Sequence, residues 1–420
     1  MAIAHRFALP SRLPLRLYAN ALALALVCSA RVQAQTVEHA TPATVAPAGW
    51  TAGAVLRARW DVRFNDVGGG GQRRTSDHLS FDTFILKADF DGRDYFASAQ
   101  YRFYGGSFLY PTASGYRNYP GEVGFPLQAY AGRRLANGDR IAVGLQPVVL
   151  DDQYWGAQVL GSIGFVIGLE EVYAPGITYK HDGPGYRLST GYYPISTPDG
   201  KGLSRDGARY STTFVQADGY VPDGTSTSER DLLAATYDWD VASYRDAKLT
   251  ASVSGLHSRL VDESGLVGHR DGERLAYAAS LKLVAASWTA KLLAARQQIN
   301  LAGVRNPDVV TVGGFDASYN IATRGTVVFA EVGMPVTLGS ESFNTYASYS
   351  RFFKDRAAFQ DSERLTLGVA WKRAALQIST ELLIGRNDPF VGAGQYLGGA
   401  AQGGDGQIKT SIFSVIGYHF

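Results

Sequence analysis

The sequence predicts an all-β protein: a transmembrane, up-and-down antiparallel β-barrel, with sixteen strands favoured and eighteen left open. Three observations predict it. Apolar and polar side chains alternate along many short segments, which is typical of strands with one apolar and one wet face. Tight turns alternate with long polar connections. Charged residues are 19% and glycine is 48 of 420 residues, against about 25% and about 7% in soluble domains.

The N-terminus has the features of a secretory signal peptide at residues 1–34. Three arginines precede an apolar run at 17–28, which is too short to span a bilayer, and a small-residue cleavage site follows at 32–34. A short helix of a cytosolic protein and a lipidated Cys28 are weaker interpretations. Removing 1–34 leaves 36 Lys and Arg against 38 Asp and Glu, so a nucleic-acid partner loses its support.

After the signal peptide we expect a short flexible lead at 35–49 and a single barrel domain at 50–420. The lead is rich in Ala, Thr and Pro. The aromatic content of 12% excludes a disordered chain. The only cysteine is Cys28, so the exported chain has no disulfide or thiol chemistry.

Alternation is clearest in the segment 54–64. One face carries apolar side chains and the other carries charged ones: Leu56, Ala58, Trp60, Val62 and Phe64 oppose Arg57, Arg59, Asp61 and Arg63. Seventeen segments are candidate strands by this criterion: 51–65, 78–90, 94–104, 123–135, 139–149, 172–181, 184–193, 230–241, 245–258, 273–285, 287–299, 309–320, 325–337, 343–354, 363–372, 374–386 and 408–420. A bacterial single-chain barrel needs an even number, so we expect one error, between 309 and 354.

The connections between these segments differ in length. Asp91-Gly92 and Asn137-Gly138 suit tight hairpin turns, because these residues tolerate positive φ. The long connections are 65–77, 105–122, 150–171, 194–229, 259–272, 300–308 and 387–407. This predicts long loops at one end of the barrel and short turns at the other.

A soluble β-sandwich would show the same alternation. However, the pattern runs uniformly from Trp50 to Phe420 without a domain boundary, and aromatic residues lie near strand ends on the apolar faces. Such aromatic girdles are typical of barrels that cross a lipid layer. Lipid outside and water inside account for both faces, and closure follows because an open edge in lipid leaves backbone groups unpaired.

The last strand, IKTSIFSVIGYHF at 408–420, ends in an aromatic-x-Phe pattern formed by Tyr418 and Phe420. With the signal peptide and the loop pattern, it resembles the Gram-negative outer-membrane porins over most of the chain, although Gly417 departs from the usual signal. The resemblance implies an outer-membrane location, folding by the barrel assembly machinery and passive diffusion of small hydrophilic solutes, often in a homotrimer. It names no subfamily and no solute.

The size of the barrel supports a channel independently. Sixteen to eighteen strands leave a water-filled lumen, and the 15 residues of the lead are too few to form a plug domain. A barrel that serves as an adhesin or structural protein through its loops, with no open pore, is the alternative. We expect no enzyme, cofactor or metal site: the sequence lacks the G-x-S-x-G, H-E-x-x-H and P-loop patterns.

Porins of the kind that this chain resembles fold one long loop into the lumen, and 150–171 is the best candidate here. Its middle is apolar and rich in glycine, whereas its ends are acidic: Asp151, Asp152, Glu170 and Glu171. An apolar loop in water is costly unless it packs on a surface, and the barrel wall offers one. The alternative is that 150–171 holds an extra pair of strands.

Positive charge for a constriction would come from Arg57, Arg59, Arg63 and Arg102 on the wall. Opposed charges across a narrow aqueous pore bias which ions pass. Asp61 lies among the first three arginines and can pair with them, so the sequence leaves the choice between anions and cations open. Solvated lumen residues without a selective role are the alternative interpretation.

Overall fold

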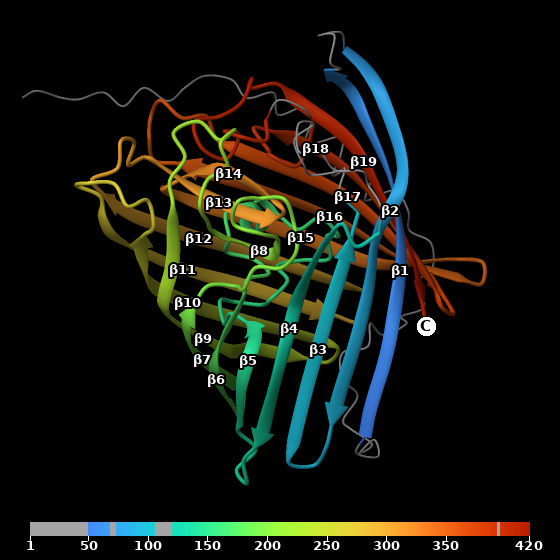
Figure 1. Cartoon of the computed structure of the whole chain (residues 1–420). Coiled ribbons are helices and arrows are strands. Elements are labelled where there is room, and N and C mark those ends of the chain that lie inside the picture. Colours follow the sequence, from blue (N-terminus) through green and yellow to red (C-terminus); the bar gives the residue numbers. More distant parts are fainter. Residues whose placement is uncertain (1–48, 68–72, 106–119, 393–394) are drawn as a thin grey trace, which may run out of the picture.

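A computed structural model of the chain describes residues 49–67, 73–105, 120–392 and 395–420 (Figure 1). Sixteen antiparallel strands close into a barrel, in which β1 pairs with both β2 and β19. The predicted fold class and the favoured strand number are therefore confirmed. The predicted signal peptide at 1–34 lies outside the described residues. No helix in the described part of the chain is long and apolar enough to cross a bilayer.

The barrel strands follow the chain order around the wall. They are β1 (Gly49–Val67), β2 (Arg73–Asp91), β3 (Tyr95–Tyr104), β4 (Val123–Arg134), β5 (Arg140–Pro147), β6 (Tyr173–Gly183), β7 (Tyr186–Ile195), β9 (Thr227–Tyr244), β10 (Ala247–Asp262), β11 (Arg270–Ala285), β12 (Trp288–Ala302), β15 (Arg324–Leu338), β16 (Glu341–Lys354), β17 (Ser362–Arg373), β18 (Leu376–Arg386) and β19 (Ile408–His419). Short turns connect them at the end that holds both Gly49 and Phe420, and long loops connect them at the other.

Three further strands form a separate antiparallel sheet in the order β14-β13-β8. They are β8 (Arg209–Phe214), β13 (Val309–Phe315) and β14 (Ala317–Ala322). Both faces of β13 and β14 are buried, and backbone hydrogen bonds from Asn320 and Ala322 to the loop between β18 and β19 extend the sheet. This sheet lies inside the barrel outline (Figure 1).

The one expected error in the strand prediction is the candidate 309–320, which is not a barrel strand. The chain reverses at Phe315, whose φ is 56°, and the segment becomes the hairpin β13–β14 of the inner sheet. Its valine-rich sequence lacks alternation because both of its faces are buried. The predicted loop 194–229 contains one strand, β8, which the sequence did not predict. The loop predicted at 65–77 is shorter in the structure, because β1 and β2 both extend into it.

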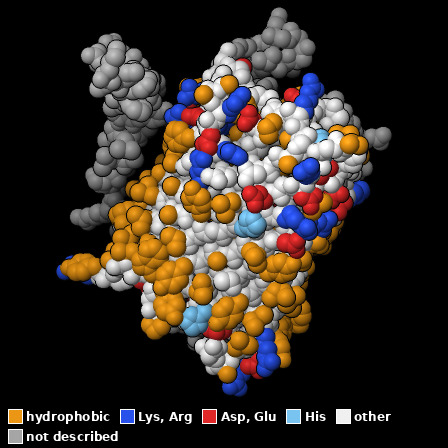
Figure 2. Space-filling view, turned by 90° about the vertical axis from the view of Figure 1, so that its left-hand side faces the viewer, with side chains coloured by type: hydrophobic (Ala, Val, Ile, Leu, Met, Phe, Trp, Pro, Cys, Tyr) orange, Lys and Arg blue, Asp and Glu red, His pale blue; other side chains and the backbone are white. Residues whose placement is uncertain are grey.

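The outer wall carries the apolar face that the alternation predicts. Figure 2 shows a belt of hydrophobic side chains, with charged side chains gathered toward its two ends. Along β11 the outward residues Leu275, Tyr277 and Leu281 are exposed, while Ala276 and Ala278 between them are buried. A broad exposed apolar belt of this kind is stable only in contact with lipid.

The barrel interior contains more buried apolar side chains than the sequence predicts. The loop between β5 and β6, the inner sheet and inward residues of the wall share one apolar core. Trp155, Ile163 and Phe165 of the loop are almost fully buried, and the ring centroid of Trp155 lies 6.2 Å from that of Phe329 on β15. The expectation of a polar inner face throughout the lumen is therefore wrong, because inward alanines and leucines face this core rather than water.

Candidate functional site

The loop between β5 and β6 packs inside the barrel against the wall. It contains the predicted segment 150–171 and holds one short helix, α2 (Ile163–Val166), instead of the alternative pair of strands. Glu170 organises the loop from within: its carboxylate accepts hydrogen bonds from the backbone N–H groups of Trp155 and Ser162, both at 3.0 Å, and from the Ser162 hydroxyl at 2.6 Å. Glu170 is therefore an internal support of the loop.

Four neighbouring strands, β15 to β18, each supply one side chain that binds the loop backbone. Glu331 accepts from Ala157 N–H at 2.9 and 3.1 Å, and Glu381 accepts from Val159 and Leu160 N–H at 2.5 and 3.3 Å. The other two contacts are Ile163 N–H to Ser350 Oγ at 3.1 Å and Arg364 Nη1 to Gly161 O at 2.7 Å. We call Glu331, Ser350, Arg364 and Glu381 the loop clamp. It fixes the tip of the loop against the wall.

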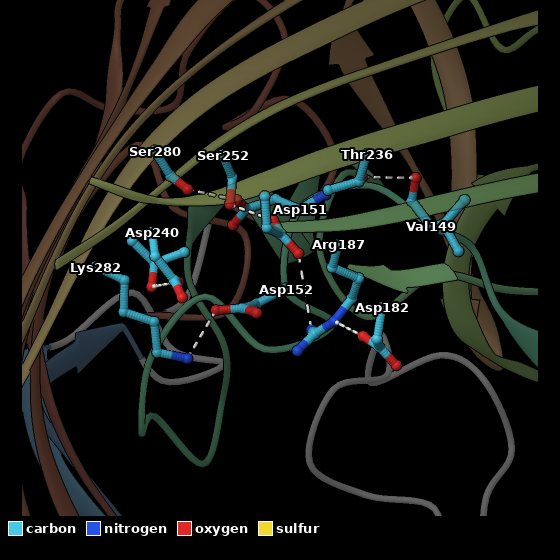
Figure 3. A network of polar contacts seen from close by, with 12 residues as sticks. Val149, Asp151, Asp152, Asp182, Arg187, Thr236, Asp240, Ser252, Ser280 and Lys282 are labelled. Atoms are coloured by element: carbon cyan, nitrogen blue, oxygen red, sulfur yellow. Dashed lines mark hydrogen bonds and ion pairs between the residues drawn. The ribbon is translucent and has the colours of Figure 1, made fainter. Parts of the chain in front are cut away.

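The acidic start of the loop lies on another part of the wall (Figure 3). Asp151 binds Lys291 and the Ser280 hydroxyl, and Asp152 lies 2.9 Å from Lys282 Nζ and 3.1 Å from Lys291 Nζ. Burial alone would raise the pKa of Asp152, but the two lysines lower it to about 2. Asp152 is therefore ionised, and both aspartates pair with lysines of β11 and β12.

The predicted arginines lie on the opposite wall, where β1, β2 and β3 meet. Arg57 Nε and Arg59 Nη1 contact the two carboxylate oxygens of Asp82 at 2.9 and 3.0 Å, and Arg59 Nε contacts Asp61 at 2.9 Å. The predicted pairing of Asp61 with an arginine is thus present. Arg63 lies further along the same face of β1, level with Ser76 and Ser411 of the neighbouring strands.

Arg102 on β3 has a different environment. Its guanidinium lies 4.5 Å from the ring centroid of Tyr210 on β8 and donates to Tyr104 Oη at 3.1 Å. Within the described residues, no carboxylate lies within ion-pair distance of it, and residues 106–119, which lie outside them, contain no Asp or Glu. Arg102 therefore contributes a positive charge that no neighbouring carboxylate balances at contact distance.

A cleft of about 60 Å³ separates the arginines from the loop tip. We call it the arginine cleft; its lining residues are Arg57, Arg59, Asp82, Arg102, Tyr104, Gly105, Val159, Leu160, Tyr210, Phe315 and Phe413. One side is the charged wall of β1 to β3, and the other is the clamped tip of the loop and the inner sheet. The structure thus brings Arg57, Arg59 and Arg102 together across this cleft from Val159 and Leu160 of the loop.

Of the four predicted acidic residues of the loop, Glu171 contacts Tyr210, which lines this cleft. Its carboxylate accepts a hydrogen bond from the Tyr210 hydroxyl, so it lies behind the ring on which Arg102 rests. Burial and the adjacent charge of Glu170 raise the pKa of Glu171 from 4.5 to about 7. The sequence did not reveal Tyr210 and Phe315, because β8 and the inner sheet were not predicted. Asp82 and Phe413 were not singled out either, although they lie on the predicted strands β2 and β19, because their part in the site depends on contacts between distant segments.

The raised pKa predicts a pH-dependent charge beside the cleft. Below pH 7 the Glu171 carboxyl is neutral and the field of the arginines is less opposed, so preference for chloride over potassium should be larger at pH 5.5 than at pH 8.5. By linkage, the stability from this burial is fully present below pH 4.5 and lost as pH rises through 7. Reversal potentials in a salt gradient test this. The variant Glu171→Gln should lose the pH dependence; an unchanged pH profile in that variant would contradict the assignment.

Comparison with solved structures identifies the fold. The anion-selective porin from Comamonas acidovorans is 14% identical, with 89% of this chain and 100% of that chain covered and a TM-score of 0.52. The outer membrane channel DcaP of Acinetobacter baumannii is 12% identical (89% and 98% covered, TM-score 0.54), and OprB of Pseudomonas putida is 11% identical (89% and 94%, TM-score 0.53). The chain has the fold of the Gram-negative outer-membrane porins. The predicted resemblance and the outer-membrane location agree with this fold.

No family model and no curated protein sequence matches the chain. Within the described ranges, no group of three or more His, Cys, Asp and Glu is arranged to hold a metal ion. The loop clamp and the contacts of Asp152 with Lys282, shown in Figure 3, and with Lys291 hold the loop, which faces the arginine cleft. These three features define the candidate site.

Proposed function

We propose that the chain is an outer-membrane channel through which small hydrophilic solutes and ions diffuse passively, and that they pass through the arginine cleft. The observation that carries the proposal is the placement of Arg57, Arg59 and Arg102 across a narrow space from the clamped loop tip. A fixed loop opposite fixed charges sets both the size and the charge of what can pass. Asp151, Asp152 and Glu170 act in this proposal by holding the loop in place.

A second candidate is a barrel without an open pore that works as an adhesin or structural protein through its loops. The apolar core that joins the loop, the inner sheet and the wall favours it, because this core fills much of the interior. Conductance of purified protein in a planar bilayer separates the two candidates. Stable current steps support the channel, and a bilayer that stays silent while the protein is inserted supports the second candidate.

The proposal includes three partners: the barrel assembly machinery, outer-membrane lipid and two further copies of the chain. Tyr418 and Phe420 are exposed at the turn end of β19, with ring centroids 5.1 Å apart, which suits a C-terminal signal read by the barrel assembly machinery. Outer-membrane lipid covers the apolar belt, and a homotrimer is the assembly that we propose. Chemical cross-linking in detergent tests the trimer, and a species no larger than one chain would contradict it.

A further inference from the structure

We propose that the arginine cleft favours small organic monocarboxylates that carry a flat apolar group, of which benzoate is the simplest probe. This inference rests on the proposed channel function and narrows its solute class. It combines three features of the cleft: one positive charge without a carboxylate partner among the described residues, aromatic rings beside that charge, and two arginines whose charges are already balanced.

The first feature is Arg102. A guanidinium presents N–H groups in a fork that fits both oxygens of a carboxylate. Arg102 rests on the ring of Tyr210 and donates from Nη1 to Tyr104. With the Gln100 amide oriented so that both of its polar atoms are satisfied, Arg102 also donates to the Gln100 oxygen from Nε at 2.7 Å and from Nη2 at 3.0 Å. Of its five N–H groups, one on Nη1 and one on Nη2 stay available to a solute, and no described carboxylate lies within ion-pair distance. In this narrow cleft, enclosed by protein on two sides, a solute carboxylate gains more from the charge than it would in open water.

The second feature is the aromatic wall. The ring of Phe315 meets those of Tyr104 and Tyr210 edge-on, at centroid distances of 5.3 and 5.7 Å. Phe413, Val159 and Leu160 complete the apolar part of the lining. A sugar would lose hydrogen bonds with water against such a surface, and an inorganic anion would gain nothing from it, whereas a flat apolar group packs favourably on rings.

The third feature limits the number of carboxylates that a solute can carry. Arg57 and Arg59 share Asp82, and Arg59 also binds Asp61, so two carboxylates balance these two arginines. A second carboxylate on the solute would lie near Asp82 without a free cation. The cleft therefore favours one carboxylate over two.

Block of chloride current in planar bilayers tests the inference. We expect benzoate to halve the current at a concentration about tenfold lower than acetate, benzyl alcohol or phthalate does, since only benzoate offers one carboxylate with a ring. Arg102→Gln should remove the advantage of benzoate over benzyl alcohol. Phe413→Leu should reduce its advantage over acetate and leave the acetate value unchanged. Arg259→Gln, an exposed outer-wall residue, is the matched control.

Each result has a distinct meaning. Equal block by benzoate and acetate in the wild type overturns the inference, as does a benzoate advantage that survives Arg102→Gln. Heat-modifiable migration in gels checks that each variant is folded, and Phe413→Leu provides an independent test if Arg102→Gln fails to fold. Absence of any chloride current from inserted wild-type protein overturns the channel itself, which is a different failure from conduction without discrimination.

Discussion

Replacing Glu331 and Glu381 together with leucine is expected to raise single-channel conductance about twofold or more and to make the current noisier. The two carboxylates accept the N–H groups of Ala157, Val159 and Leu160. Leucine has similar size but accepts nothing. A buried N–H group left unpaired costs about 1 to 3 kcal/mol, which applies to Leu160 in full, to the half-buried Val159 in part and to the exposed Ala157 least. The tip of the loop should therefore leave the wall and widen the arginine cleft.

The matched control is the double variant Glu331→Gln with Glu381→Gln, which keeps an acceptor oxygen at both positions. Its conductance should stay near that of the wild type. Glu263→Gln, on an exposed loop between β10 and β11, controls for the loss of a carboxylate elsewhere. Unchanged conductance in the folded leucine variant would show that the clamp does not set the width of the passage.

Reversing Arg57, Arg59 and Arg63 to glutamate is expected to shift ion preference strongly toward cations. Two of these residues line the arginine cleft, where charges act at short range and with little screening. The chloride-to-potassium permeability ratio should fall about fivefold or more. Reversal potentials in a potassium chloride gradient measure the ratio directly.

Variants with fewer substitutions sharpen this prediction. Arg63→Glu alone should have little effect, because Arg63 is not among the residues that line the cleft, whereas Arg57→Glu with Arg59→Glu should account for nearly all of the shift. Since these changes place new carboxylates beside Asp61 and Asp82, the neutral pair Arg57→Gln with Arg59→Gln serves as a milder version. A folded triple variant with the wild-type reversal potential would remove these arginines from the solute path.

The barrel could be predicted from the sequence because lipid and the lumen impose opposite demands on successive side chains. Leu56, Trp60 and Phe64 are exposed on the outer face of β1, while Arg57 and Arg59 face inward. The sequence also predicted that one of the strand candidates between 309 and 354 is wrong. That segment lacks alternation, since its side chains are buried inside the barrel on both faces.

The interior could not be predicted in the same way, because its contacts join residues far apart in the chain. Glu381 binds Val159, and Asp151 binds Lys291; no spacing in the sequence links these pairs. One signal was available: along β11, Ala276 and Ala278 alternate with Leu275 and Tyr277, so both faces are apolar. Apolar residues on the inner face indicate a wall that packs against protein, as the loop and inner sheet do here.

The central claim is that solutes pass between the arginine wall and the loop tip, and Val159→Cys tests it most directly. The only natural cysteine, Cys28, lies in the predicted signal peptide, so the new thiol is the only one in the exported chain. Labelling with a charged methanethiosulfonate should block more than half of the chloride current, whereas labelling of Val253→Cys on the lipid-facing wall should not. Complete labelling of Val159→Cys, verified by mass, with no change in current would contradict the claim.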